Sequence, residues 1–295
     1  MPKRAAAAAL SYSSSSTATT TSSVSSSVSS SSKKKRKSDS PLVLVINLRR
    51  REDRLRKLRG VLRGRLSTWE RVDAIDGRKL TWDDAAQHLT PKALAQARWA
   101  EEKTIPTICG KTGSFSPHFT LGGIACALSH KKAWQRLASS KQHDWALILE
   151  DDLACVSVEL DGALERCVSS LPSSWQLCMV GYHESSGHLH TPEMRMRVSE
   201  LGPDESQTGL FGYLLRKSAA VELISCRQIW PLSNQIDVQL GRRHWRAMSR
   251  FTVSPDSVLV HSPKSEEGDC DTDVQSLGAS DKKAHGSMQK GMLVL

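Results

Sequence analysis

Uninterrupted apolar runs along the chain predict its buried strands. Residues 42–48 and 145–149 are the clearest, because both are almost wholly apolar and short. Such runs are typical of strands buried on both faces of a sheet, with a buried helix segment as the alternative for residues 145–149. Residues 175–181, 209–215 and 258–261 predict three further strands.

Between these runs the period of the apolar positions changes to that of a helix. Leu55, Leu58 and Leu62 fall on one face while Arg and Lys occupy most of the remaining positions, which predicts a basic helix after the first strand. Further helices are expected in residues 81–100, 120–137, 153–171 and 217–226, with Thr90 and Thr120 as N-caps. Strands that alternate with helices predict an α/β domain with a mainly parallel central sheet flanked by helices.

The two ends of the chain differ from this pattern. Residues 1–40 are dominated by Ser, Thr and Ala, so they lack the apolar surface needed to offset the entropy of ordering, and we expect a disordered basic tail. Residues 264–295 are again polar and are expected to be flexible. One folded domain is therefore predicted over residues 41–263.

The net charge of the chain is +10, but residues 1–40 contribute +6 of it, so most of the excess charge lies in the predicted tail. A basic tail and an arginine-rich helix favour anionic partners, so a nucleic-acid-binding protein is one alternative. The scarcity of aromatic residues for base stacking argues against it, and no specific nucleic acid is expected.

The location of the protein in the cell stays open from the sequence. No segment has the length and apolar character of a transmembrane helix, and no secretory signal peptide is legible. The Ser-rich, acid-poor start resembles a transit peptide, so an organelle or the secretory pathway is an alternative to the cytoplasm. The seven cysteines are irregularly spaced, which predicts free thiols in a reducing compartment and favours the cytoplasm.

Three adjacent carboxylates, Glu150, Asp151 and Asp152, follow the apolar run at residues 145–149. Ligands of α/β sheets bind at the carboxyl ends of the strands, and oxygen ligands suit a hard divalent cation. Because side chains alternate along a strand, Glu150 and Asp152 should face one side and Asp151 the other. The alternative is a polar loop or the acidic first turn of a helix.

Two other groups of polar residues are candidates for binding. The arginines at the start of the predicted basic helix could hold a diphosphate, although a solvated basic face is the more common role. His183, His188 and His190 could bind a metal, but their loop fixes no spacing, so we expect flexible surface residues.

Several blocks in order along residues 42–262 make the chain similar to glycosyltransferase family 25, which includes lipopolysaccharide galactosyltransferases and procollagen galactosyltransferase domains. The blocks are Val45-Ile46-Asn47-Leu48 with Arg51 and Arg54, Ala74 with Asp76-Gly77, Leu121-Gly122 with Cys126-Ala127-Leu128-Ser129-His130, and Leu149-Glu150-Asp151-Asp152. The chain departs from the family in having Gly123 where an acid is usual and Ala125 where a glycine is usual.

The resemblance implies a GT-A-like single domain that uses a UDP-sugar, with UDP-galactose favoured, and a divalent cation, Mn²⁺ or Mg²⁺. It implies Glu150, Asp152 and His261 as metal ligands. It also implies a donor site formed by Asn47, Arg51, Arg54, Asp76, Gly77, Ser129, His130 and Asp151.

The family looks inverting, which implies a carboxylate that deprotonates the acceptor hydroxyl. Asp237 is the candidate base, and a helix-start acid or a partner of Arg242 or Arg243 is the alternative. The acceptor is expected to be a saccharide or a hydroxylated protein. A catalytically inactive GT-A-like protein or a basic nucleic-acid-binding protein is the alternative function.

Overall fold

The computed structural model places seven strands in one sheet in the order β2-β1-β5-β9-β7-β10-β8. It describes residues 41–105, 108–109, 114–115, 118–202, 205, 207–241, 248–262 and 273–274. The sheet strands are β1 (Leu42–Asn47), β2 (Glu70–Asp73), β5 (Trp145–Glu150), β7 (Leu177–Gly181), β8 (Val198–Glu200), β9 (Gly212–Arg216) and β10 (Arg250–Val253). Two-stranded sheets are formed by β3 (Ile108–Cys109) with β4 (Ser114–Phe115) and by β6 (Cys155–Val156) with β11 (Val260–His261).

Most strands of the large sheet run in the same direction. β1 pairs in parallel with both β2 and β5, and β7 pairs in parallel with β10. β9 lies antiparallel between β5 and β7, and β8 is antiparallel to β10 at the edge. The predicted mainly parallel sheet is therefore confirmed, and the mixed α/β arrangement is consistent with the expected GT-A-like domain.

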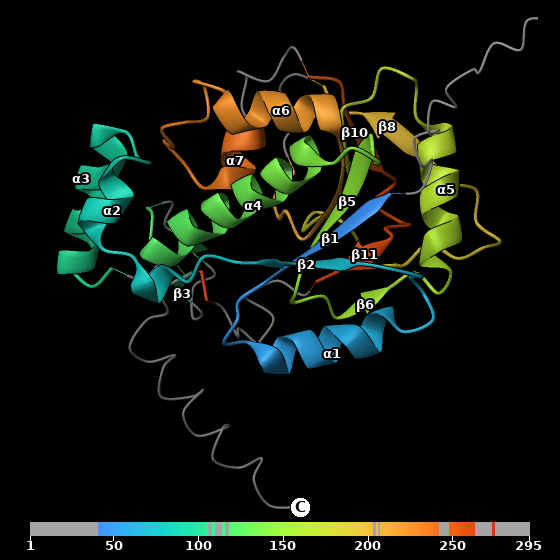
Figure 1. Ribbon diagram of the computed structural model, residues 1–295, viewed down its shortest axis with the longest axis horizontal. Helices are drawn as coiled ribbons and strands as arrows, with labels where there is room; N and C mark the ends of the chain where they lie inside the picture. Colours follow the sequence, from blue (N-terminus) through green and yellow to red (C-terminus); the bar gives the residue numbers. More distant parts are fainter. Residues whose placement is uncertain are drawn as a thin grey trace, which may run out of the picture. The chain divides into compact units, whose positions relative to one another are not determined.

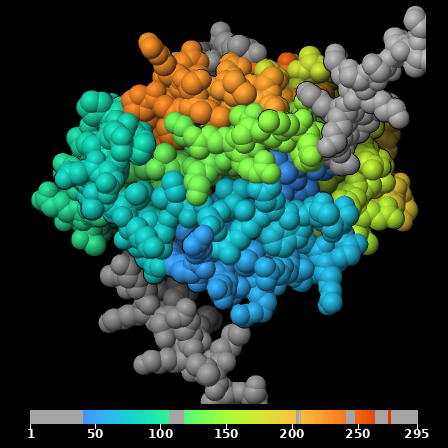
Figure 2. Space-filling model, viewed as in Figure 1, coloured from blue at the N-terminus to red at the C-terminus, as the bar shows by residue number. Residues whose placement is uncertain are grey.

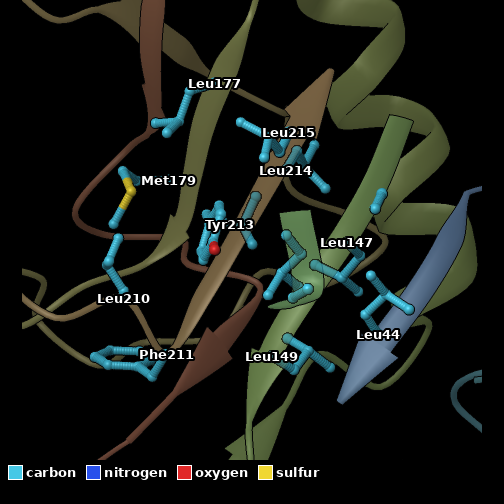
Figure 3. Packing of buried hydrophobic residues seen from close by; sticks show 14 of the residues in the cluster. Leu44, Leu147, Leu149, Leu177, Met179, Leu210, Phe211, Tyr213, Leu214 and Leu215 are labelled. Atoms are coloured by element: carbon cyan, nitrogen blue, oxygen red, sulfur yellow. The ribbon is translucent and has the colours of Figure 1, made fainter. Parts of the chain in front are cut away.

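β5 is a buried strand of the sheet, as the sequence predicted. Leu147, Ile148 and Leu149 are fully buried, because β5 lies between β1 and β9 and both faces of the sheet are covered. Figure 3 shows Leu147 and Leu149 of β5 beside Leu44 of β1 and Tyr213 of β9. Burial of a whole aliphatic side chain contributes about 1.5–3 kcal/mol, so this strand is held firmly at the centre of the domain.

The helices cover the sheet. They are α1 (Glu52–Leu62), α2 (Trp82–Ala86), α3 (Pro91–Glu102), α4 (Leu121–Ser139), α5 (Leu160–Ser170), α6 (Lys217–Ser225) and α7 (Ile236–Gly241), with the 3₁₀ turn η1 (Gly77–Lys79). In Figure 1, α4 and α6 lie on one side of β1 and β5 while α1 lies on the other. Figure 2 shows the surface of α4, in green, between that of α6 and that of residues 50–80. In the described part of the chain, no helix is long and apolar enough to cross a bilayer.

The predicted N-caps explain where two helices begin. The hydroxyl of Thr120 accepts a hydrogen bond from the Gly123 amide, and that of Thr90 accepts one from the Ala93 amide. Each cap satisfies a helix N–H that lacks an intrahelical partner, which typically contributes ~1 kcal/mol. The α4 cap also fixes the first turn of that helix next to the end of β1, where the candidate site lies.

The prediction of one helix over residues 153–171 was wrong for its first part. α5 starts at Leu160, and β6 precedes it and pairs with β11 through Cys155↔His261 and Val156↔Val260. The predicted strand at residues 258–261 therefore lies in a two-stranded sheet and not in the large one. Next to β7, the large sheet instead contains β10, which the sequence did not predict. A partner strand about a hundred residues away decides this structure, and local periodicity carries no record of it.

The sequence also led to expectations about the loop histidines and the cysteines. His190 is fully buried, so the expectation of a surface residue was wrong there; its amide donates to the carbonyl of Val258, which draws the segment inward. The cysteines in the described part whose side chains are placed are free, as expected: Cys126, Cys155, Cys167, Cys178 and Cys226. The predicted tails, residues 1–40 and most of residues 264–295, lie outside the described residues.

Candidate functional site

A pocket lies where the parallel strands β1 and β5 end beside the first turns of α4. The register Ile46↔Glu150 brings the next residues, Asn47 and Asp151, to the same edge of the sheet. The pocket wall includes Asn47, Arg54, Gly77, Gly122, Cys126, Ser129, His130, Glu150, Asp151, Asp273 and Val274. Seven of the residues predicted from the sequence as donor or metal ligands therefore share one cavity wall.

Asp151 is turned toward β1 and α1. Its carboxylate accepts hydrogen bonds from Asn47 Nδ2 at 2.6 Å and from Arg54 Nη1 at 3.0 Å. Asn47 Nδ2 also donates to the carbonyl of Arg51 at 3.1 Å, which links the end of β1 to the start of α1. Burial raises the pKa of Asp151, and the charge of Arg54 and the hydrogen bond from Asn47 offset only part of that rise. Asp151 therefore connects three elements at the pocket.

Glu150 is turned toward α4. His130 Nε2 lies 3.0 Å from Glu150 Oε1, and His130 Nδ1 lies 3.0 Å from the hydroxyl of Tyr213 on β9. That hydroxyl also accepts a hydrogen bond of 2.8 Å from Trp134 Nε1. A carboxylate only accepts, so we assign a His130 proton to Nε2 and the Tyr213 proton to the bond with Nδ1. With this assignment, the Trp134 N–H, the Tyr213 hydroxyl and both ring nitrogens of His130 each take part in a hydrogen bond.

The carboxylates of Glu150 and Asp152 differ in their tendency to be charged. Burial by itself would raise the pKa of Glu150. The hydrogen bond from His130, together with electrostatic interactions with His130, His183 and Arg54, holds this pKa below its ordinary value. Burial within the surrounding protein and the charge of Glu150 raise the pKa of Asp152 to about 7. The Asp152 side chain nevertheless reaches solvent, so water screens part of that repulsion.

Cys126 lies among the acids of the site. Burial, followed by the charges of Glu150, Asp237 and Asp152, raises the pKa of its thiol well above the ordinary value, which keeps Cys126 neutral. Ligand atoms of Cys126, His130 and Glu150 lie within 4.8 Å of one another, and among the described residues they are the group that meets this criterion for a metal. Asp237 acts on the same thiol as Glu150, but it lines a different cavity, together with Leu177 and Met179.

Asp237 lies in the first turn of α7. Its carboxylate accepts hydrogen bonds from the amides of Val238 at 2.7 Å and Gly209 at 3.2 Å. This is the helix-start position that the sequence offered as an alternative to a catalytic base, and the two roles are compatible because a carboxylate has further lone pairs. Arg242 and Arg243, its other suggested partners, lie outside the described residues.

His261 is held at the end of β11 by backbone pairing with β6. Its carbonyl accepts from the Ala154 amide at 2.9 Å, and the next hydroxyl, Ser262 Oγ, donates to the Asp152 carbonyl at 3.1 Å. His261 Nδ1 is buried and has no hydrogen-bond partner among the described residues. An unpaired imidazole nitrogen is costly to bury, so this atom is suited to a ligand that the protein alone does not supply.

The remaining predicted residues shape the backbone around the pocket. Ser129 Oγ accepts from the Ile75 amide at 2.8 Å and donates to the Ala125 carbonyl at 2.6 Å, which ties the loop after β2 to α4. Asp76 caps η1 and pairs with Arg50 and Arg78. Gly77 packs against Gly122, since a Cβ on Gly77 would lie 2.7 Å from the Gly122 Cα. In this structure Ser129, Asp76 and Gly77 hold the wall of the pocket.

Three residues near the pocket were not assigned to it from the sequence. Tyr213 contacts His130, and the sequence placed it in the predicted strand at residues 209–215 without a role in binding. His183 packs against Phe211 with ring centroids 5.2 Å apart and acts on the pKa of Glu150. Asp273 pairs with Arg50 and Arg51, and no pattern in the sequence indicates this contact.

The comparison with known protein families gives a match over most of the folded part of the chain. The model described as glycosyltransferase family 25 (LPS biosynthesis protein) matches residues 41–239, which is more than half of the chain and confirms the predicted resemblance. Among curated proteins, no sequence matches the chain. Asn47, His130, Glu150 and Asp237 lie within the matched segment, whereas His261 and Asp273 lie beyond it.

Proposed function

The chain belongs to glycosyltransferase family 25, and from this premise we propose that it transfers a sugar, galactose in the first instance, from a UDP-sugar to an acceptor hydroxyl with inversion at the anomeric carbon. The observation that carries the proposal is the pocket at the ends of β1 and β5, where His130 orients Glu150. The acceptor is a saccharide or a hydroxylated protein, as the family resemblance implies.

Two carboxylates support the proposal of a divalent cation. Glu150 raises the pKa of neighbouring Asp152, and such repulsion between two carboxylates is relieved when a cation binds both. Oxygen ligands suit Mn²⁺ or Mg²⁺, and His261, with its unpaired Nδ1, is the further candidate ligand. When bound there, the cation would neutralise charge on the departing diphosphate.

The protein's own groups divide the remaining work. His130 keeps the Glu150 carboxylate in one orientation through its Nε2–H, and Tyr213 keeps His130 in the required tautomer. Asp237 is the proposed base: as the acceptor oxygen bonds to the anomeric carbon and the bond from that carbon to UDP breaks, the hydroxyl proton passes to Asp237. Arg54 and Asn47 keep Asp151 turned away from Glu150.

Nucleic-acid binding has less support. The arginines at the start of α1 pair with carboxylates: Arg49 with Asp73, Arg50 with Asp76 and Asp273, Arg51 with Asp53 and Asp273, and Arg54 with Asp151. Contacts to phosphates of a nucleic acid would have to replace these ion pairs.

The test is turnover by the full chain with a panel of UDP-sugars, with Mn²⁺ present or chelated. We expect release of UDP from UDP-galactose that requires the cation and is lost in Asp152→Asn. Asp161→Asn is the matched control, since the Asp161 carboxylate accepts from the Ser67 amide outside the pocket. Full activity of Asp152→Asn, or no turnover of any UDP-sugar by the wild type, would contradict the proposal.

A further inference from the structure

Two residues from the C-terminal part of the chain, Asp273 and Val274, lie in the candidate pocket. The Asp273 carboxylate binds both arginines at the start of α1, with Oδ1 2.5 Å from Arg50 Nη2 and Oδ2 2.7 Å from Arg51 Nη1. The carbonyl of Val274 accepts a hydrogen bond from the Thr120 hydroxyl, which is also the N-cap of α4. One carboxylate thus occupies the space between two guanidinium groups.

The backbone of this segment also lies against α4. A Cβ on Gly122 would overlap with the Asp273 carbonyl oxygen and would lie 3.0 Å from the Val274 Cα. Real Cβ atoms do not approach that closely, so the contact depends on glycine at this position. Asp273 and Val274 are therefore held by two ion pairs, a hydrogen bond and a close backbone contact.

Asp273 and Val274 form part of the wall of the candidate pocket. The Asp273 carboxylate makes the contacts to Arg50 and Arg51 that an anionic group of a donor would make. A donor that bound its diphosphate to these arginines would therefore have to displace Asp273.

The arginines are suited to receive the diphosphate when Asp273 leaves. Guanidinium groups bind carboxylates and phosphates through the same paired N–H donors. Arg50 stays fixed by Asp76 at 3.0 Å and Arg51 by Asp53 at 2.8 Å, so both keep their positions without Asp273.

We propose that Arg50 and Arg51 form a subsite for the diphosphate of the donor, and that Asp273 occupies this subsite as an internal ligand that the donor displaces. The identity of the donor rests on the proposed function. The anion subsite and its internal ligand rest on the contacts of Asp273 and Val274. Competition of this kind lowers the apparent affinity for the donor by the fraction of molecules in which the subsite is open.

The first test is calorimetric binding of UDP in the presence of Mn²⁺ to the full chain and to Asp273→Asn. If Asp273 fills the subsite in nine molecules of ten, its loss should tighten UDP binding about tenfold. Asp73→Asn is the matched control, because Asp73 pairs with the neighbouring Arg49 in an exposed position outside the pocket. We expect little change in the control. If the wild type binds UDP, unchanged or weaker UDP binding by Asp273→Asn would overturn the proposal.

Amide hydrogen exchange of the wild-type protein is the second measurement. Peptides that contain residues 273 and 274 should exchange faster once UDP and Mn²⁺ are added, because the donor displaces them. Greater protection would mean that the segment closes over the donor, and it would overturn displacement.

Inorganic pyrophosphate separates this inference from the proposed function. If neither protein binds UDP but Asp273→Asn binds pyrophosphate more tightly than the wild type, the subsite stands and the proposed donor fails. If UDP-sugars are turned over but Asp273→Asn binds neither ligand more tightly, the subsite inference fails alone.

Discussion

His130 Nε2 lies 3.0 Å from Glu150 Oε1, so a histidine in the middle of α4 fixes a carboxylate at the end of β5. Twenty residues separate the two in sequence, and the helix packs on the strand that bears the acid. The contact leaves the second oxygen of Glu150 available to a ligand. It also explains why Glu150 stays charged next to Asp152.

Replacing Glu150 by Gln should remove one carboxylate of the proposed cation site while keeping the size of the side chain. We expect weaker Mn²⁺ binding by at least about tenfold, comparable to the loss of a direct ligand or of its supporting partner. Titration calorimetry with Mn²⁺ measures this, and Asp161→Asn is again the control. Equal Mn²⁺ affinity in Glu150→Gln would place the cation elsewhere.

Binding of Mn²⁺ should strengthen as pH rises from about 6 to 8. The pKa of Asp152 is raised to about 7 by burial and by Glu150, so below that pH the carboxyl keeps a proton that must leave before a cation binds. Above it, affinity should level off. Calorimetric titration at several pH values checks this, and Asp152→Asn should show a flatter profile. The same slope in wild type and variant would assign the proton to another group.

Tyr213→Phe should destabilise the protein and loosen the site. The change leaves Trp134 Nε1 and His130 Nδ1 buried without the hydroxyl, which costs about 1–3 kcal/mol of the free energy of unfolding. Urea unfolding measures that cost.

Tyr182→Phe is the matched control, since its buried hydroxyl donates to the Val253 carbonyl outside the pocket. Both variants should lose stability, but only Tyr213→Phe should also lower kcat and Mn²⁺ affinity. Equal kinetic effects in the two variants would deny His130 its positioning role.

Asp76 should contribute stability that disappears in acid. The hydrogen bond from Arg78 and the charge of Arg50 lower its pKa from 3.8 to about 2. A carboxyl with a lowered pKa stabilises the fold above its unfolded value, and this stabilisation is lost as pH falls from ~4 toward 2.

Asp76→Asn should therefore lower the free energy of unfolding by about 1 kcal/mol near pH 5, and by less near pH 3, after allowance for the exposed Arg78. Urea unfolding at both pH values measures the difference. A cost that is the same at the two pH values would mean that Asp76 acts without its charge.

Much of the scaffold could be predicted locally. Five apolar residues before Glu150 need no distant information to become a buried strand, because both faces of β5 are covered and the run has no polar position. The Thr120 cap and the leucine stripe of α1 are likewise properties of a few adjacent residues. The acid triplet at the end of a strand and the family blocks around it indicated where ligands would bind.

The sequence by itself determined most of the elements, the family and the edge of the sheet at which the candidate site lies. Only the tertiary structure decided that Asp151 faces Asn47 and Arg54, that His130 holds Glu150, and that Asp273 lies between Arg50 and Arg51. The reason is physical: side-chain periodicity records which face of an element is buried, but not which distant segment covers it. The contact of Asp273 with Arg50 spans 223 residues, and no local pattern specifies a partner at that separation.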